Sequence, residues 1–110
     1  MQALDRIFVA LSDPNRRRMA ERLSRGPATV KQLAEPVEMR LPSAVKHLKV
    51  LEDSGIVVSR KDGRARTYSL QPAALMLIAD WVRDREAALN AAFDRLEAAM
   101  REIPEEETGP

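Results

Sequence analysis

The stretch PSAVKHLKVLEDSGIV, from Pro42 to Val57, decides the fold. Its apolar residues recur at three- and four-residue intervals, the spacing of an amphipathic α-helix, and Ser54-Gly55 ends the pattern. We expect one face of this helix to be buried, formed by Leu41, Ala44, Val45, Leu48 and Leu51. The face turned away from it is cationic and carries Pro42, Ser43, Lys46 and His47. The stretch therefore predicts a helix that packs on a core and keeps its charges outside.

Two helices are expected at the amino-terminal end. Apolar residues from Leu4 to Leu11 follow helical spacing and predict the first helix. Asp13 and Pro14 follow it, and these residue types favour the N-cap and the first position of a helix. A second helix should therefore begin at Pro14.

A short third helix is expected between the second helix and the Pro42 stretch. Thr29 and Gln32 have the spacing of a capping box, which marks a helix start. This helix should end before Pro36. The link formed by residues 37–40 is short enough to set the two flanking helices at a steep angle.

A basic β-hairpin is expected after Gly55. Residues 56–60 are rich in β-branched side chains, and residues 66–70 alternate as a return strand. Asp62-Gly63 is a turn signal suited to a two-residue type I′ loop. The hairpin carries four cations, Arg60, Lys61, Arg64 and Arg66.

The last helical pattern runs from Pro72 towards Pro104 without an internal glycine or proline. Apolar residues recur along it every seven positions, at Val82, Leu89, Leu96 and Ile103. Because such a helix is longer than a small core needs, we interpret this stripe as a dimer interface completed by the first helix. The expected interface comprises Leu4, Ile7, Phe8, Leu11, Val82, Leu89, Phe93, Leu96 and Met100. The alternative is a monomer that buries these residues in its own core.

The chain has 110 residues and 12.3 kDa, which fits one domain. We expect a single domain over residues 1–103 and a disordered polar tail at residues 104–110. No apolar run approaches the roughly 20 residues of a membrane span, and no signal peptide is recognisable. We therefore expect a cytoplasmic protein that has no membrane partner.

The chain contains no cysteine and a single histidine, His47. Disulfides, thiolate metal sites, cysteine nucleophiles and multi-histidine sites within one chain are therefore excluded. There is also no glycine-rich phosphate loop and no suggestive carboxylate pair. We expect no enzyme activity, no metal site and no cofactor.

The net charge of +1 hides a segregation of charge along the chain. Residues 1–39 hold seven basic and five acidic side chains, residues 40–66 seven and three, and residues 67–110 four and nine. A basic centre followed by an acidic segment is typical of a face that binds a polyanion, with the acidic segment employed separately. Ordinary surface charge is the alternative.

The expected fold is mainly α-helical with a small β-hairpin, in the order α-α-α-α-β-β-α. A short helix, a tight link and a cationic helix form a helix-turn-helix, and the basic hairpin after them makes it a winged helix. The major groove of B-DNA accepts one helix, and a neighbouring hairpin can reach the adjacent backbone. This pattern predicts a DNA-binding protein. His47 either reads DNA or forms a hydrogen bond on the surface.

Three segments resemble the ArsR family of bacterial winged-helix repressors: LSDPNRR at residues 11–17, ATVKQLA at residues 28–34, and residues 42–57 with KHLKVL. The resemblance covers roughly residues 4–103. It implies a homodimeric transcriptional repressor that binds an inverted-repeat, double-stranded DNA operator through the Pro42 helix and the hairpin. By residue match it implies DNA contacts from Ser43, Lys46, His47, Lys49, Arg60, Lys61, Arg64 and Arg66.

Arg40 and Pro42, at the start of the same helix, complete the expected DNA-binding set. Arg40 stands where many relatives have a serine cap, and it either binds a phosphate or is simply exposed to solvent. Val45 stands where relatives often have a second serine, so their base preference cannot be transferred to this chain.

Relatives that sense metals use cysteine pairs near the third helix, or histidine and acidic clusters on the terminal helix. This chain has neither set. We therefore expect that metals do not release its DNA. Control would come from the abundance of the protein, or from an unidentified organic effector or partner bound near the dimer interface.

A rival interpretation keeps the winged helix but uses it for contact with another protein. Salt separates the two hypotheses, because binding through several phosphates weakens steeply as salt rises and a largely apolar interface does not. The basic helix and hairpin favour DNA.

Overall fold

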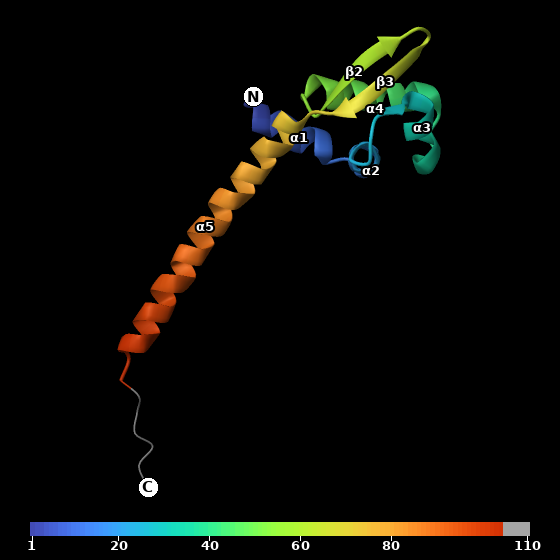
Figure 1. Cartoon of the computed structure of the whole chain (residues 1–110). Coiled ribbons are helices and arrows are strands. Elements are labelled where there is room, and N and C mark those ends of the chain that lie inside the picture. The colour runs from blue at the N-terminus through green and yellow to red at the C-terminus, as the bar shows by residue number, and fades with distance from the viewer. Residues whose placement is uncertain (105–110) are drawn as a thin grey trace. The chain divides into compact units, whose positions relative to one another are not determined.

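Figure 1 shows the computed structural model of the chain, which describes residues 1–104. The chain divides into two compact units, residues 1–78 and the residues from Ala79 onward, and each is described by itself. The tail that the sequence predicts to be disordered falls, from Glu105 on, outside the described residues.

The first unit combines helices with a small antiparallel sheet. Its elements are α1 (Ala3–Leu11), α2 (Pro14–Leu23), β1 (Ala28–Thr29), α3 (Val30–Ala34), the 3-10 helix η1 (Glu35–Val37), α4 (Leu41–Asp53), β2 (Val57–Asp62), β3 (Ala65–Leu70) and the start of α5 (Pro72–Glu102). This order confirms the predicted winged helix-turn-helix.

The starts of α2 and α3 form as their sequences predict. The carboxylate of Asp13 accepts hydrogen bonds from the backbone N–H groups of Asn15 at 2.8 Å and Arg16 at 3.1 Å. The hydroxyl of Thr29 accepts the N–H of Gln32 at 3.3 Å, while the Gln32 side-chain oxygen accepts the N–H of Thr29 at 2.9 Å. Both caps satisfy N–H groups that have no partner inside their helix.

The sheet has three strands in the order β1-β3-β2, so the predicted hairpin gains a third strand. In β1, Ala28 pairs with Tyr68 and Thr29 pairs with Thr67. Two residues are too few to show the alternation of a strand, and their partners lie far away in the sequence. β1 is therefore not predicted from the sequence.

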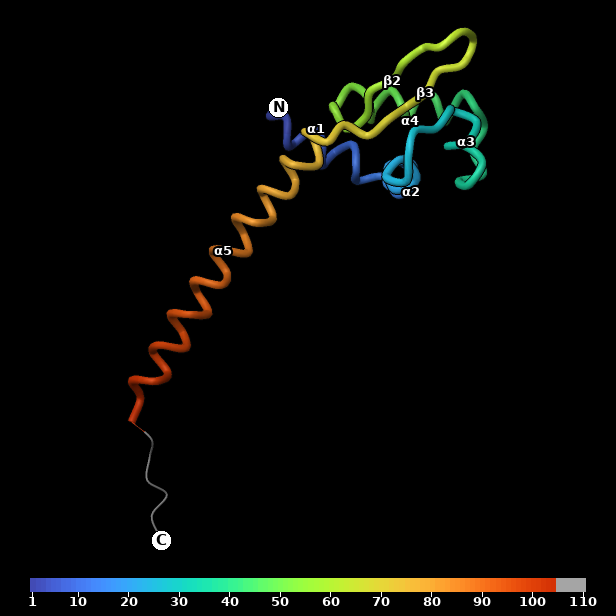
Figure 2. Tube along the Cα trace, viewed as in Figure 1, coloured from blue at the N-terminus to red at the C-terminus, as the bar shows by residue number. Residues whose placement is uncertain are grey.

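The loop of the hairpin lies one residue later than predicted. Asp62 pairs with Ala65, so the two loop residues are Gly63 and Arg64. The φ of Gly63 is +63°, and Arg64 is not among the described residues with positive φ. A positive φ at the first loop residue alone is typical of a type II′ turn, so the predicted type I′ loop at Asp62-Gly63 is wrong. Figure 2 traces this reversal between β2 and β3.

The core of the first unit is apolar and draws on α1 to α4, the start of α5 and the hairpin. Its largest fully buried side chains are Ile7, Met19, Leu33, Leu48, Leu51, Ile56 and Val57. Tyr68 of β3 is also buried and so fixes which face of the hairpin lies on the helices. The core therefore holds α4 and the hairpin on one scaffold.

The buried stripe of α4 is narrower than predicted. Ala44, Leu48 and Leu51 are buried, but Leu41 is 50% exposed and Val45 is 47% exposed. At about 100° per residue, these two side chains lie along one flank of the stripe, and His47 lies along the other. The prediction that Leu41 and Val45 are buried is wrong.

The second unit continues α5, and all its helical residues, from 79 to 102, are exposed in the single chain. The helix ends at Glu102, one residue before Ile103. Within residues 1–104, none of the helices combines the length and the apolar character needed to cross a membrane.

Candidate nucleic-acid interface

The link between α3 and α4 is closed by backbone hydrogen bonds. Glu38 has a left-handed backbone with φ 51°, and its N–H donates to the carbonyl of Glu35 at 3.1 Å. The N–H of Met39 donates to the carbonyl of Ala34, also at 3.1 Å. This reversal follows η1 and lets α4 pack against α3.

α4 presents most of its predicted DNA-binding residues on its exposed side. Arg40 is its N-cap residue and forms no side-chain capping bond. The exposed members of the set are Arg40, Pro42, Ser43, Lys46 and Lys49. Polar and cationic groups therefore cover this side of α4, whereas its other side packs on the core.

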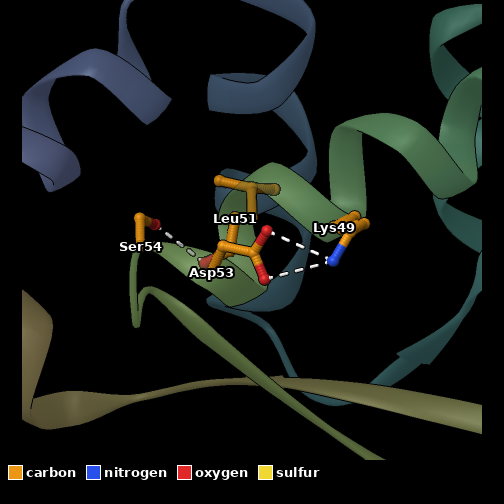
Figure 3. Close-up of polar contacts among 4 residues, drawn as sticks. All are labelled: Lys49, Leu51, Asp53 and Ser54. Atoms are coloured by element: carbon orange, nitrogen blue, oxygen red, sulfur yellow. Dashed lines mark hydrogen bonds and ion pairs between the residues drawn. The ribbon is translucent and has the colours of Figure 1, made fainter.

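The C-terminal end of α4 contains its own ion pair, as Figure 3 shows. The ammonium of Lys49 lies 3.3 Å from Asp53 Oδ2, and both side chains are exposed. The hydroxyl of Ser54 donates to the carbonyl of Leu51 at 2.8 Å and satisfies a carbonyl at the helix end. In the absence of DNA, the ammonium of Lys49 is therefore already paired with the Asp53 carboxylate.

His47 differs from the other α4 candidates because it is half-buried. Its Nδ1 lies 3.3 Å from Nη1 of Arg16 in α2. This contact has no signal in the sequence, since the two residues are 31 positions apart and only the packing of α2 on α4 brings them together.

The carboxyl group at the start of α2 has a shifted pKa. The pKa of the Asp13 carboxyl is held below its ordinary value, mainly by the hydrogen bond from the Arg16 backbone N–H. Partial desolvation opposes this effect, and the N–H of Asn15 and the charges of His47 and Arg16 add to it. A carboxylate, a guanidinium and an imidazole therefore interact where α2 meets α4.

The four cations of the hairpin are exposed, but they do not share one face. Lys61 pairs with Arg66 across the strands, two positions beyond the buried Tyr68, so both lie on the face that packs on the core. Arg60 pairs with Thr67 on the opposite face, and Arg64 lies in the loop. We call β2, β3 and their loop the wing.

One hydroxyl connects the wing to α4. The hydroxyl of Ser59 in β2 donates to Glu52 Oε1 at 2.5 Å and accepts a hydrogen bond from Arg66 Nη1 at 2.8 Å. Burial raises the pKa of the neighbouring Tyr68 hydroxyl, and the charge of Glu52 raises it further. Arg66 is therefore held on the inner face of the wing.

The apolar stripe of α5 is open in the single chain. Leu89 is 56% exposed, Phe93 58%, Leu96 57% and Met100 63%, and Val82 is exposed as well. The guanidinium of Arg85 lies 5.2 Å from the centre of the Trp81 ring, one turn away on the same helix. We call Val82, Leu89, Phe93, Leu96 and Met100 the seam.

The α1 residues predicted for the dimer interface differ in exposure. Phe8 is exposed, and Leu4 and Leu11 are half-buried. Ile7, however, is 1% exposed and belongs to the core of its own chain. A partner could not reach it without a shift of α1, so we leave Ile7 out of the interface proposed below.

No group of three or more histidine, cysteine, aspartate or glutamate side chains within residues 1–104 is arranged to hold a metal ion. The first unit presents hydrogen-bonding groups and cations on α4 and the wing, and the second unit presents the apolar seam.

Comparisons with known proteins agree with this geometry. Residues 11–60 match a family model described as a helix-turn-helix domain. The transcriptional regulator Rv2034 of Mycobacterium tuberculosis is 41% identical over 71 residues, which cover 64% of this chain and 66% of that protein. The crystal structure of the ArsR family transcriptional regulator RHA00566 is 43% identical, with a TM-score of 0.76, and the match covers 81% of this chain and 98% of that one.

A more distant structure has the same fold. The homodimeric winged helix-turn-helix DNA-binding domain Mb0332 of Mycobacterium bovis is 23% identical, with a TM-score of 0.64, and the match covers 81% of this chain and 83% of that one. RHA00566 is 43% identical and is covered over 98% of its own length, and these two values establish the family. The chain belongs to the ArsR family of helix-turn-helix transcriptional regulators.

Proposed function

We propose that this regulator binds an inverted-repeat DNA operator as a homodimer and represses transcription from it. The observation that carries the proposal is the exposed side of α4, where Ser43 and Lys46 stand free of the core while α3 supports the helix from behind. One helix of this kind fits the major groove, where hydroxyl and ammonium groups can bond to base edges.

The two cationic elements have different roles in this proposal. Ser43, Lys46 and His47 read bases, while Arg40, Pro42 and Lys49 lie against the flanking sugar-phosphate backbone. The wing binds phosphates through Arg60, Lys61, Arg64 and Arg66. Leu41 and Val45, which were expected in the core, are exposed on α4 and add apolar groups that suit thymine methyls.

The homodimer is supported by the seam. An isolated helix gains nothing from apolar residues spaced seven apart, whereas two such helices can bury them against each other. Residues 1–103 would act as one functional domain, with Leu4, Phe8 and Leu11 contributing further partner contacts. The Mycobacterium bovis domain of the same fold is itself described as homodimeric.

The test begins with selection of bound sequences from a pool of random duplexes. The selected duplex and a scrambled duplex are then titrated with protein and followed by fluorescence anisotropy at several salt concentrations. We expect tighter binding to the selected duplex, a palindromic consensus, and steep weakening with salt. Failure to enrich any sequence would contradict the proposal.

A winged helix that contacts another protein and does not bind specific DNA is the second candidate, since the same fold would serve it. It predicts weak binding of every duplex. In either case we expect regulation through protein abundance or an organic effector near the seam.

A further inference from the structure

The guanidinium of Arg16 joins two helices through three contacts. Its Nε donates to the carbonyl of Ala10 at 2.6 Å, and its Nη2 donates to the carbonyl of Val9 at 3.3 Å, both at the C-terminal end of α1. Its Nη1 lies 3.3 Å from Nδ1 of His47 in α4. The guanidinium is therefore held by two carbonyls of α1 while it contacts Nδ1, the ring nitrogen of His47 that faces the protein.

This contact determines where the imidazole carries its hydrogen. Every guanidinium N–H is a donor, so Nδ1 of His47 has to be the acceptor and carries no hydrogen. The hydrogen of the neutral ring is then on Nε2. A hydrogen on Nδ1 as well would set a second positive charge against Arg16, although the Asp13 carboxylate nearby would offset part of that repulsion.

The other ring nitrogen remains available. Within residues 1–104, Nε2 of His47 makes no hydrogen bond, and no side-chain nitrogen of a half-buried residue is both hidden from solvent and unsatisfied. The Nε2–H group is therefore accessible from outside, on the flank of the helix that we propose to lie in DNA.

We propose that Arg16 is a positioning residue for DNA reading, because it holds His47 as the Nε2–H tautomer and so makes it a hydrogen-bond donor. The inference rests on the proposed function of α4. A donor at this position needs an acceptor on the DNA, such as N7 or O6 of guanine, and is not satisfied by the amino group of cytosine. Arg16 thus sets which base edge His47 can read.

A matched control stands next to Arg16 in the chain. Arg17 also holds the end of α1, since its Nη1 donates to the carbonyls of Leu11 at 2.8 Å and Ser12 at 3.1 Å, but it is not hydrogen-bonded to His47. Arg16→Met and Arg17→Met therefore both remove capping of α1, and Arg16→Met alone frees the imidazole. Arg16→Lys keeps the charge but cannot make all three contacts.

The first measurement is independent of DNA. His47 is the sole histidine, so protein labelled with ¹⁵N-histidine gives one imidazole spin system whose two nitrogens report their protonation directly. At pH 8 we expect an unprotonated Nδ1 and a protonated Nε2 in the wild type and in Arg17→Met, and a mixture of tautomers in Arg16→Met. A mixture, or hydrogen on Nδ1, in the wild type would overturn the inference without any variant.

The second measurement uses the selected operator. We expect Arg16→Met to weaken operator binding about tenfold, and to have no further effect in a His47→Ala background. Arg17→Met should act independently of His47→Ala. Equal behaviour of the two arginine variants would overturn the inference, whereas a wild type that does not distinguish operator from scrambled DNA would instead reject the proposed function.

Discussion

Ser59 of the wing donates its hydroxyl hydrogen to Glu52 of α4, and 2.5 Å separate the two oxygens. Because Arg66 donates to the same hydroxyl, the orientation of a wing cation depends on a residue of the helix proposed to read DNA. α4 and the wing are therefore connected by side chains as well as by the short chain segment between them.

We expect Ser59→Ala to weaken operator binding about fivefold, which corresponds to the roughly 1 kcal/mol of a typical hydrogen bond. The link is exposed, so the melting temperature should change little. Anisotropy titrations and circular dichroism melts measure the two effects. Glu52→Gln is the control, since its amide oxygen can still accept the bond while the negative charge is lost; it should bind DNA at least as tightly as the wild type.

Substitutions on α4 should separate base reading from general attraction. Ser43→Ala and Lys46→Ala should each cost about 1 to 3 kcal/mol on the operator and clearly less on scrambled DNA. Lys49→Ala should cost less than either, because Asp53 already pairs with its ammonium. Titration of all three variants against both duplexes provides the measurement, and an equal loss on both duplexes for each would show that α4 does not read the bases.

The features that the sequence predicted are those with local signals. The Asp13-Pro14 pair and the Thr29 to Gln32 spacing mark helix starts through hydrogen bonds that span two or three residues. The cations of the candidate site were chosen by residue type and stay a prediction, and the ArsR family was recognised from three short segments. The comparisons confirm that assignment, and with it a regulator rather than an enzyme.

The features that it missed depend on distant partners. β1 exists because Ala28 meets Tyr68, and the hairpin loop lies one residue later than predicted because Asp62 pairs with Ala65 across the strands. The Arg16 contact likewise requires α2 to pack on α4. A helical pattern also cannot tell which apolar residues are exposed, which is why Leu41 and Val45 were misplaced.

Neighbouring cations of the wing should contribute differently to DNA binding, because they lie on opposite faces of the hairpin. Lys61→Ala should lower the slope of log affinity against log salt by about 1, as expected for one lost phosphate contact. Arg60→Ala should lower it less, since Arg60 lies on the opposite face from Lys61 and Arg66. Affinities on scrambled DNA at four or more salt concentrations give both slopes. A larger effect of Arg60→Ala would mean that the outer face of the wing meets the DNA.

Acid should remove the contribution of Asp13 to stability. Because the native pKa of Asp13 is lowered, the stabilisation is complete above the unfolded value of 3.8 and is lost as pH falls through the native pKa. Asn is also a good N-cap but does not titrate here, so Asp13→Asn should be less stable than the wild type at pH 7 and approach it at pH 2.5. Urea unfolding at one fixed protein concentration measures this difference, and a gap that stays constant with pH would contradict the assignment.

Assembly should depend on one side of α5. Leu89→Glu or Leu96→Glu places a carboxylate in the seam, where a dimer would bury it without a partner, so each variant should be monomeric. Ala91→Glu is the matched control: it adds the same charge to the same helix, about 200° around from Leu89, and should leave the dimer intact. In sedimentation velocity at micromolar concentration, we expect the wild type and Ala91→Glu at twice 12.3 kDa and the seam variants at 12.3 kDa.

The seam variants should also bind the operator more weakly although no DNA contact has changed, because each half-site is then bound separately. A wild type that sediments as a monomer would exclude the seam as a dimer interface.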